Sequence, residues 1–309
     1  MKNVLLFTGQ GSQFSGMGAE LAAMLPEASA IYEAGSDILG FDLKKMCLEG
    51  EDAVLAETCH AQPAIYATEL ICLEALKARG IACEGVCGHS LGEYAAMTAC
   101  GMLTAENGFR ALKIRAQAMD EAAKSQDSGM YAILRMPAER IGEICAQTPG
   151  YVVPVNFNSP AQTVIAGERQ AVDAAAKACA AEKARAVPLA VAAAFHSKLM
   201  QPAADAIAAA FTAIPFAPPT VPFYTNLTGA PLAEGTDMAQ YCAKHCVSPV
   251  RFAQELQNLH AAGFDTYIEL GPKKVLTAFV KQTLKDVGMH TVTDPDSLEE
   301  TVTCLKHTD

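Results

Sequence analysis

A serine flanked by two glycines is the first residue in the chain that could act as a nucleophile. The segment Gly88-His89-Ser90-Leu91-Gly92 matches the GxSxG pattern, with a strand-like run at 85–88 before it and a helical composition at 94–100 after it. Both glycines answer a steric need, since a Cβ at either position would collide with the strand or the helix. Such a turn exposes Ser90 Oγ and directs the Leu91 N–H toward an oxyanion formed beside it. The bare pattern also arises by chance in glycine-rich loops, but a strand, turn and helix around it favour a nucleophile.

A second loop could complete an oxyanion hole. Residues 4–7 are typical of a short buried strand, and they end in the glycine- and amide-rich loop 8–13. A nucleophile turn of the hydrolase type needs a backbone N–H from a loop that follows another strand. The segment Gly9-Gln10-Gly11 is such a loop, although a simple tight turn remains the alternative.

Ser90 needs a general base, because an unactivated hydroxyl is a poor nucleophile at neutral pH. The turn should point His89 away from Ser90 Oγ. Four other histidines are expected on helix surfaces or in solvent near the C-terminus: His60, His260, His290 and His307. His196 and His245 therefore remain as candidates. His196 follows the point where the chain leaves a small predicted subdomain, so it could lie at the mouth of a cleft between domains.

The elements that must position these residues alternate between strands and helices, which predicts an α/β fold. We expect a helix over 62–79, a strand-like segment at 223–225 and a strand over 266–270. The pattern changes between 126 and 194, where strand-like runs at 130–135 and 151–158, a hairpin into 163–166 and an alanine-rich helix at 171–184 follow one another. We interpret 126–194 as an inserted subdomain.

Composition excludes several classes of protein. The chain has 309 residues, of which 51% are hydrophobic and 18% charged, so disorder, a collagen-like repeat and a coiled coil are excluded as the main architecture. Its eleven cysteines form no CxxC pair and no Cys/His cluster at metal-ligand spacing, and no signal peptide is recognised before the first strand. We therefore expect free thiols, no metal and a cytoplasmic location.

Charge and hydropathy limit the partners. The formal net charge of −11 disfavours nucleic acid, which requires a basic surface. Even the longest alanine-rich runs, such as 203–216, are too short or too interrupted to cross a membrane. A local basic patch could still recruit an acidic protein, because a net charge is screened beyond about 8 Å at physiological ionic strength.

A series of motifs in a common order resembles the malonyl-CoA:acyl-carrier-protein transacylases of bacterial fatty-acid synthesis, and more broadly the acyltransferase domains of fatty-acid and polyketide synthases. They are GQGSQ at 9–13, QPA at 62–64, GHSLGEY at 88–94, an arginine in KIRAQ at 113–117, NFNSPAQTVIAG at 156–167, AFHS at 194–197, YTNLTG at 224–229, SPVRF at 248–252 and ELGPKKVL at 269–276. GHSLGEY is far more specific than GxSxG, and the resemblance covers nearly the whole chain.

This resemblance implies an α/β-hydrolase-like core with a central, mostly parallel sheet, formed by 1–125 and 195–309, and a ferredoxin-like subdomain at 126–194. It implies that Ser90 is the nucleophile and His196 its base. The backbone N–H groups of Gln10 and Leu91 would form the oxyanion hole.

Two residues are implied to choose the acyl group. Arg115 aligns with the arginine that binds the free carboxylate of malonate, and a guanidinium suits that role as a permanently charged bidentate donor. Without the resemblance, a helix-surface ion pair of Arg115 with Asp120 or Glu121 would be favoured. Phe195 resembles the malonyl-selecting version of its motif, since its bulk leaves little room for an α-methyl group.

One departure from the family pattern concerns the orientation of the base. Many bacterial members carry a glutamine at the position of His245, and its main-chain carbonyl orients the catalytic imidazole. Every residue has a carbonyl, so the contact can survive here. The His245 side chain could instead compete as a base or alter the charge near His196.

The implied reaction moves a malonyl group from malonyl-CoA to the phosphopantetheine thiol of acyl carrier protein, through a malonyl-serine ester and without a cofactor. We expect a monomer that uses neither nucleic acid nor a membrane. Alternatives are a discrete malonyl acyltransferase of a polyketide synthase, a serine acyl hydrolase and, from another class, a silent scaffold, which would have lost Ser90 or His196. Candidate basic residues for an acidic carrier protein are Lys198, Lys244, Arg251, Lys273 and Lys274.

Overall fold

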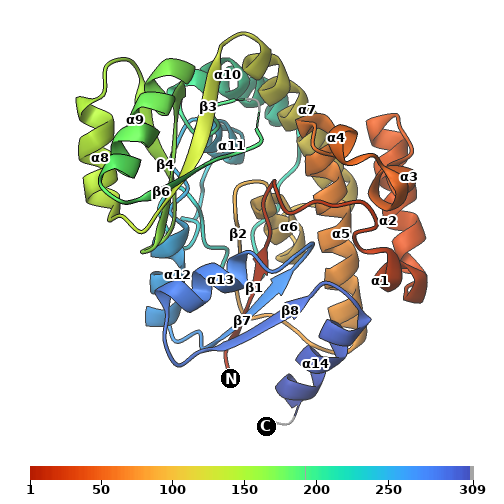
Figure 1. Cartoon of the computed structure of the whole chain (residues 1–309). Helices are drawn as coiled ribbons and strands as arrows, with labels where there is room; N and C mark the ends of the chain where they lie inside the picture. Colours follow the sequence, from red (N-terminus) through yellow and green to blue (C-terminus); the bar gives the residue numbers. More distant parts are fainter. Residues whose placement is uncertain (192, 307–309) are drawn as a thin grey trace.

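Four parallel strands form the sheet of the larger of two units (Figure 1). The computed structural model describes residues 1–191 and 193–306. The strand order is β2-β1-β7-β8, and each neighbouring pair is parallel. The bounds are β1 Asn3–Phe7, β2 Val86–Gly88, β7 Thr266–Leu270 and β8 Gly288–Val292. Residues 4–7 and 266–270 are buried throughout, as expected for parallel strands covered on both faces.

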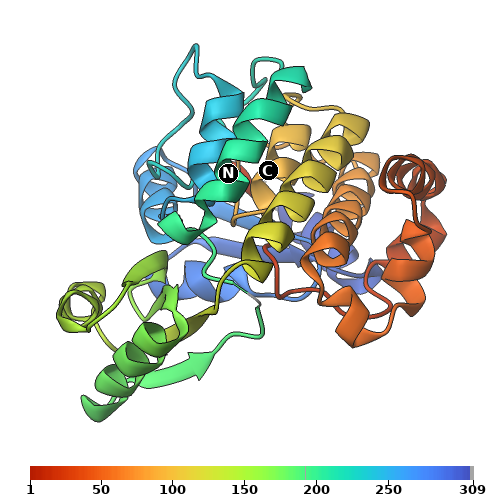
Figure 2. The same ribbon diagram turned by 90° about the horizontal axis from the view of Figure 1, so that it is seen from above.

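Helices cover this sheet. The N-terminal ones are α1 Ala19–Met24, α2 Glu27–Leu39, α3 Leu43–Glu49, α4 Asp52–Leu55, α5 Thr58–Ala78, α6 Gly92–Ala99 and α7 Ala105–Lys124. The C-terminal ones are α10 Gln201–Ala210, α11 Met238–Cys246, α12 Phe252–Ala261, α13 Leu276–Thr283 and α14 Pro295–Lys306, with 3₁₀ turns at Lys198–Met200 and Phe211–Ala213. Helix α7 packs between α5 and α10, as the view from above shows (Figure 2).

The smaller unit has the order β-α-β-β-α-β. Its elements are β3 Ser128–Leu134, α8 Ala138–Gln147, β4 Val152–Ser159, β5 Gln162–Glu168, α9 Arg169–Ala181 and β6 Arg185–Pro188. They form an antiparallel sheet of order β4-β5-β3-β6, which is the ferredoxin-like arrangement that the family resemblance implied. Ile133 and Ile165 pack with α8 and α9, whereas Ala132 and Val164 face the larger unit. The period of two thus buries both faces of this sheet.

The sequence located most of these elements and missed others. Strand β7 matches its prediction, and β4 and β5 form the predicted hairpin. Helix α5 begins at Thr58, whereas the prediction began at 62, and Pro63 lies inside the helix. Helix α8 and strands β6 and β8 were not predicted. The expectation of a strand at 223–225 is wrong, since the chain makes only isolated bridges there, at Phe223 and Tyr224, before it turns.

No helix in the described ranges combines the length and the apolar character that a membrane crossing requires.

Candidate active site

The serine turn is enforced by backbone packing on both sides. Ser90 lies between β2 and α6 with a φ of 56°, a left-handed conformation that L-residues rarely adopt. A Cβ on Gly88 would lie 2.1 Å from the carbonyl carbon of Gly92, and one on Gly92 would lie 2.2 Å from the oxygen of Phe7 in β1. Only glycine fits at either position, so the helix stands directly on the strand and leaves Ser90 partly exposed.

His196 meets the serine hydroxyl directly. Its Nε2 lies 2.7 Å from Ser90 Oγ, and its Nδ1 lies 3.0 Å from the backbone oxygen of His245. The carbonyl can only accept, so Nδ1 carries the hydrogen and Nε2 presents a lone pair to the serine. Burial and the nearby Arg115 guanidinium lower the pKa of His196 to about 3. The imidazole is therefore neutral at physiological pH and able to take a proton from Ser90.

Arg115 reaches the same hydroxyl from α7. Its Nη2 donates to Ser90 Oγ at 3.1 Å, and its guanidinium carbon lies 5.6 Å from the centre of the Tyr94 ring. The residue is 1% exposed, and its Nε has no hydrogen-bond partner. Among the described residues no carboxylate forms an ion pair with it. The alternative of a surface ion pair is wrong, because Asp120 pairs with Lys124 instead, at 2.7 Å.

Of the two expected oxyanion donors, Leu91 directly follows the serine, and Gln10 lies in a loop packed on the serine turn, since a Cβ on Gly9 would come within 2.9 Å of His89 O. Within the described ranges, no acceptor binds the backbone N–H of Gln10 or of Leu91. The Gln10 side chain is turned toward α5, where its Nε2 lies 3.3 Å from Thr58 Oγ1 and its Oε1 accepts from Gln62 at 3.3 Å. Both N–H groups thus remain available for a ligand.

A cleft of about 210 Å³ opens beside this loop, between the two units. The loop 9–12, His89 and α13 line it from the larger unit, and strands β3 to β5 line it from the smaller one. His89 points away from Ser90, as predicted, and its Nε2 lies 2.7 Å from Asn158 Oδ1 on β4. Val250 also bridges the units, since it exchanges backbone hydrogen bonds of 2.8 and 2.9 Å with Val155 and Phe157. The smaller unit is therefore tied to the serine turn.

His245 takes only one of the roles considered for it. Its carbonyl holds His196, but its ring lies behind the site, with Nε2 3.0 Å from Asn226 Oδ1 and Nδ1 3.3 Å from Glu93 Oε2. Both ring nitrogens are occupied, and neither contacts Ser90. Burial and nearby positive groups hold the pKa of His245 well below its ordinary value.

Sequence reasoning missed a buried polar group behind the serine. Asn226 accepts from the Ser90 N–H at 2.8 Å and donates to Gly88 O at 2.7 Å. Glu93 accepts from the Asn226 N–H at 2.7 Å and from the Tyr241 hydroxyl at 2.7 and 2.9 Å, and burial raises the pKa of Glu93 to about 8. YTNLTG and GHSLGEY contain Asn226 and Glu93, but neither motif says that the two meet.

The remaining predicted residues lie around the site or on the surface. Phe195 is 6% exposed and packs in the main hydrophobic core next to His196. Lys273 Nζ lies 3.4 Å from Gly11 O, in the loop 9–12, and Lys198 Nζ lies 4.1 Å from the centre of the Tyr151 ring. Lys244, Arg251 and Lys274 are exposed. His290 is half-buried in β8 rather than solvated, and His307 lies outside the described residues.

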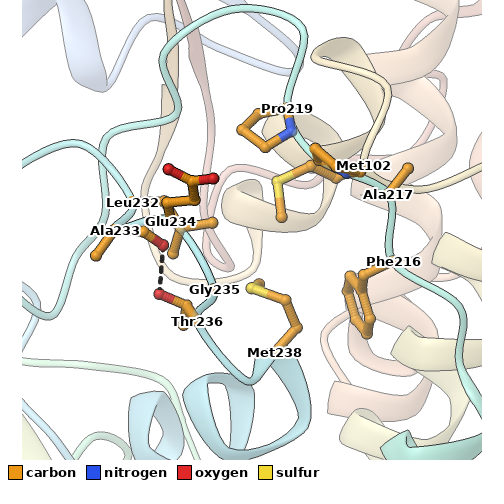
Figure 3. A pocket seen from close by; sticks show the side chains of 11 residues that line it. Met102, Phe216, Ala217, Pro219, Leu232, Ala233, Glu234, Gly235, Thr236 and Met238 are labelled. Atoms are coloured by element: carbon orange, nitrogen blue, oxygen red, sulfur yellow. Dashed lines mark hydrogen bonds between the residues drawn. The ribbon is translucent and has the colours of Figure 1, made fainter.

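Two further features that could form a site lie away from the serine. Within the described ranges, the one group of three close metal-ligating side chains is Glu57, Cys59 and His60, and His60 Nδ1 already contacts Val54 O at 3.1 Å. A cavity of about 450 Å³ lies between the loops 216–219 and 232–238 (Figure 3). None of the predicted site residues lines it.

Comparison with known proteins gives consistent results over the full length. The family model described as acyl transferase domain matches residues 4–302. The malonyl CoA-acyl carrier protein transacylase of Bacillus subtilis (strain 168) is 35% identical, with 99% of this chain and 98% of the relative covered. The structure of the transacylase of the same name from Clostridium perfringens has a TM-score of 0.95 at 34% identity, with 100% and 98% covered. A malonyl-transacylase in complex with a type II polyketide-synthase acyl-carrier protein has a TM-score of 0.94 at 33% identity, with 98% and 100% covered.

Proposed function

This chain belongs to the acyl transferase family, and from that premise we propose that it transfers a malonyl group from malonyl-CoA to the phosphopantetheine thiol of acyl carrier protein, in fatty-acid biosynthesis. The observation that supports the proposal is that His196 and Arg115 both contact the hydroxyl of Ser90. Ser90 Oγ lies 2.7 Å from a neutral imidazole and 3.1 Å from a buried guanidinium. The first group can activate the serine, and the second can bind a free carboxylate.

The first half-reaction loads the enzyme. Ser90 Oγ attacks the thioester carbonyl of malonyl-CoA while His196 Nε2 takes the proton. The backbone N–H groups of Gln10 and Leu91 stabilise the oxyanion. The tetrahedral intermediate collapses, the protonated His196 gives its proton to the departing sulfur, and coenzyme A leaves. The product is a malonyl ester of Ser90.

The second half-reaction reverses the roles. The carrier-protein thiol attacks the ester carbonyl, and His196 removes the thiol proton and returns it to Ser90 Oγ as the C–O bond breaks. The backbone oxygen of His245 keeps Nδ1 protonated throughout, so a third carboxylate is unnecessary. The proposed reaction uses no cofactor, and its two substrates are the thioester malonyl-CoA and the thiol of the carrier protein.

Arg115 and Phe195 select the acyl group. An isolated charge in a buried site is unfavourable, and the free carboxylate of a malonyl group supplies the missing partner, which an acetyl group lacks. The unpaired Nε of Arg115 offers a second donor for a bidentate contact. Phe195 beside His196 restricts the room for a substituent on the α-carbon.

We also propose that the enzyme acts as a cytoplasmic monomer. The contacts of Ser90 with His196 and Arg115 form within a single chain, so the proposed chemistry needs no residue from a second copy. Within the described residues, the ten cysteines from Cys47 to Cys246 are free thiols, as expected in a reducing compartment.

Acyl selectivity provides the test. Replacing Arg115→Ala should lower kcat/KM for malonyl-CoA by on the order of a hundredfold or more relative to acetyl-CoA, because the carboxylate loses a buried charged partner. Arg110→Ala is the matched control, since Arg110 is an exposed residue of the same helix that binds Asn107. Equal losses for both thioesters would remove Arg115 from the carboxylate role.

A carrier protein of polyketide synthesis is the second candidate acceptor. One of the similar structures is a malonyl-transacylase bound to such a carrier, and the proposed chemistry is the same for both. Initial rates with a fatty-acid and a polyketide carrier protein would decide between them. We expect the fatty-acid carrier to be the faster acceptor.

A further inference from the structure

The proposed nucleophile and base contact each other directly, and a second chain of hydrogen bonds connects them through His245 and Asn226. Ser90 Oγ contacts His196 Nε2, and His196 Nδ1 donates to the His245 carbonyl. The ring of His245 contacts Asn226 Oδ1 at 3.0 Å, and the same oxygen accepts from the Ser90 N–H at 2.8 Å. These four contacts close a ring through Ser90, His196, His245 and Asn226. The two contacts that His245 makes are buried, and the two that Ser90 makes are partly buried.

The ring has a defined direction of hydrogen bonding. The Nδ2 group of Asn226 donates to Gly88 O and to Glu255 Oε1, both at 2.7 Å, so its Oδ1 must face Ser90 and His245. An amide oxygen only accepts, so Nε2 of His245 must carry the hydrogen. The Nδ1 of His245 then presents a lone pair to Glu93 Oε2, which suits a protonated Glu93.

Two of the four residues joined by these hydrogen bonds, Ser90 and His196, have a strained backbone. Ser90 has a φ of 56° and His196 a φ of 61°, and such conformations persist only where the surroundings over-determine them. Asn226 Oδ1 accepts a hydrogen bond from the backbone N–H of Ser90, and the His245 carbonyl accepts one from the imidazole of His196. The side-chain contact between His245 and Asn226 ties these two supports together.

We propose that the His245 side chain, acting through Asn226, is a positioning residue that sets the distance and direction between Ser90 Oγ and His196 Nε2. The inference rests on the roles proposed above for Ser90 and His196. It goes beyond the backbone contact, because any residue at position 245 would supply the carbonyl but only one with a side-chain donor would close the ring. The effect on substrate binding should be small, since His245 contacts neither the oxyanion loop nor Arg115 within the described structure.

The experiment separates the effect of the His245 side chain from that of its backbone carbonyl. His245→Leu keeps the carbonyl and an apolar volume but removes the donor. We expect the rate of Ser90 malonylation to fall by between about tenfold and a hundredfold with an unchanged KM for malonyl-CoA, because small misplacements of reacting groups cost up to about 10²-fold in rate. His245→Gln places an amide donor near Asn226 and should recover most of the loss. A wild-type rate in a folded His245→Leu would overturn the proposal.

Tyr241→Phe is the matched control. Tyr241 is a buried residue of the same helix whose hydroxyl contacts Glu93 outside the ring, so its loss should leave the malonylation rate close to that of wild type. A loss as large as that of His245→Leu would assign both effects to general destabilisation and contradict the proposal. Ser90→Ala in the same assay tests the proposed function separately, since malonylation that survives it would refute the nucleophile whatever His245 does.

A measurement on the unmodified protein covers the case in which His245→Leu does not fold. In ¹⁵N-histidine-labelled enzyme at pH 7, His196 should be the neutral Nδ1–H tautomer and His245 the neutral Nε2–H tautomer. The His245 signal is assigned by its loss in His245→Gln. An Nδ1–H tautomer at His245 would mean that the bond to Asn226 is not made and would overturn the inference.

Discussion

Ser90 is a donor and an acceptor at once. Its hydroxyl donates to the lone pair on His196 Nε2 and accepts a hydrogen bond from Arg115 Nη2. The positive guanidinium stabilises negative charge that develops on the oxygen, and it also helps to keep the neighbouring imidazole neutral. In the proposed mechanism, Arg115 therefore prepares the nucleophile as well as the pocket for the carboxylate.

This arrangement predicts an unusual pH dependence. The ordinary pKa of histidine is 6.5, but that of His196 is lowered to about 3, so the base stays neutral well below pH 6.5. We expect kcat/KM for malonylation to show no acid limb near pH 6.5 and to hold its value down to at least about pH 5. A stopped-flow pH profile that bends with a pKa near 6.5 would contradict this.

The lowered pKa of His196 also makes the stability of the protein depend on pH. Below pH 6.5 the unfolded chain binds a proton at His196 that the folded chain refuses until about pH 3. His196 therefore lowers the free energy of unfolding progressively as the pH falls from 6.5 toward 3, and it has no such effect above pH 6.5.

Sequence reasoning found the residues that the family motifs carry and missed those that depend on a tertiary contact. Ser90, His196 and Arg115 stand in recognisable motifs, and the structure brings them together. Asn226 lies 136 positions from Ser90 in the chain, and nothing in its local sequence shows which backbone group it would meet. The fate of the His245 ring was undecidable for the same reason.

At the scale of elements, the turn from β2 into α6 depends on two glycines for different reasons. Gly88 makes room for the first turn of α6, whereas Gly92 lets α6 lie on β1. The sequence predicted this strand-turn-helix unit because its signal is local. Helix α8 was missed, although its apolar residues Ile141, Ile144 and Cys145 pack as one face. The strand expected at 223–225 is reduced to two isolated bridges, from Phe223 to Val86 and from Tyr224 to Pro231, and the local sequence does not show that the pairing stops there.

Substitution of one glycine tests the close approach. A Cβ at Gly92 would meet backbone atoms of Phe7 and Thr8 at 2.2 and 2.5 Å, so Gly92→Ala should lower the free energy of unfolding by about 1–3 kcal/mol and displace Ser90. Gly142→Ala in α8 is the control, since nothing lies within 4 Å there. It should stabilise the protein by about 0.5–1 kcal/mol. Urea denaturation measures both, and a neutral Gly92→Ala would refute the steric account.

At the scale of the whole molecule, the inserted unit lies over the serine turn and forms one wall of the cleft. The antiparallel sheet and its helices span residues 128–188, within the 126–194 expected from the change in pattern. The sequence could delimit this unit because its β/α alternation differs from that of the core. It could not predict the contact of His89 with Asn158, which links two motifs 69 residues apart.

The chain as a whole is acidic, with a net charge of −11, and an acidic carrier protein would need a local basic surface. Lys273 at the oxyanion loop and its neighbour Lys274 are the best placed. Reversing both charges to Glu should raise KM for the carrier protein by on the order of tenfold at low salt and leave KM for malonyl-CoA unchanged. Lys44→Glu with Lys45→Glu, on α3, is the control. No change in KM would reject the patch.

The central claim is that Ser90 carries the malonyl group between the two thiols. Intact-protein mass measured after brief mixing with malonyl-CoA tests it most directly. We predict that the wild-type chain gains one malonyl group, that holo acyl carrier protein removes it, and that folded Ser90→Ala gains none. A Ser90→Ala chain that acquires the same malonyl group would contradict the account.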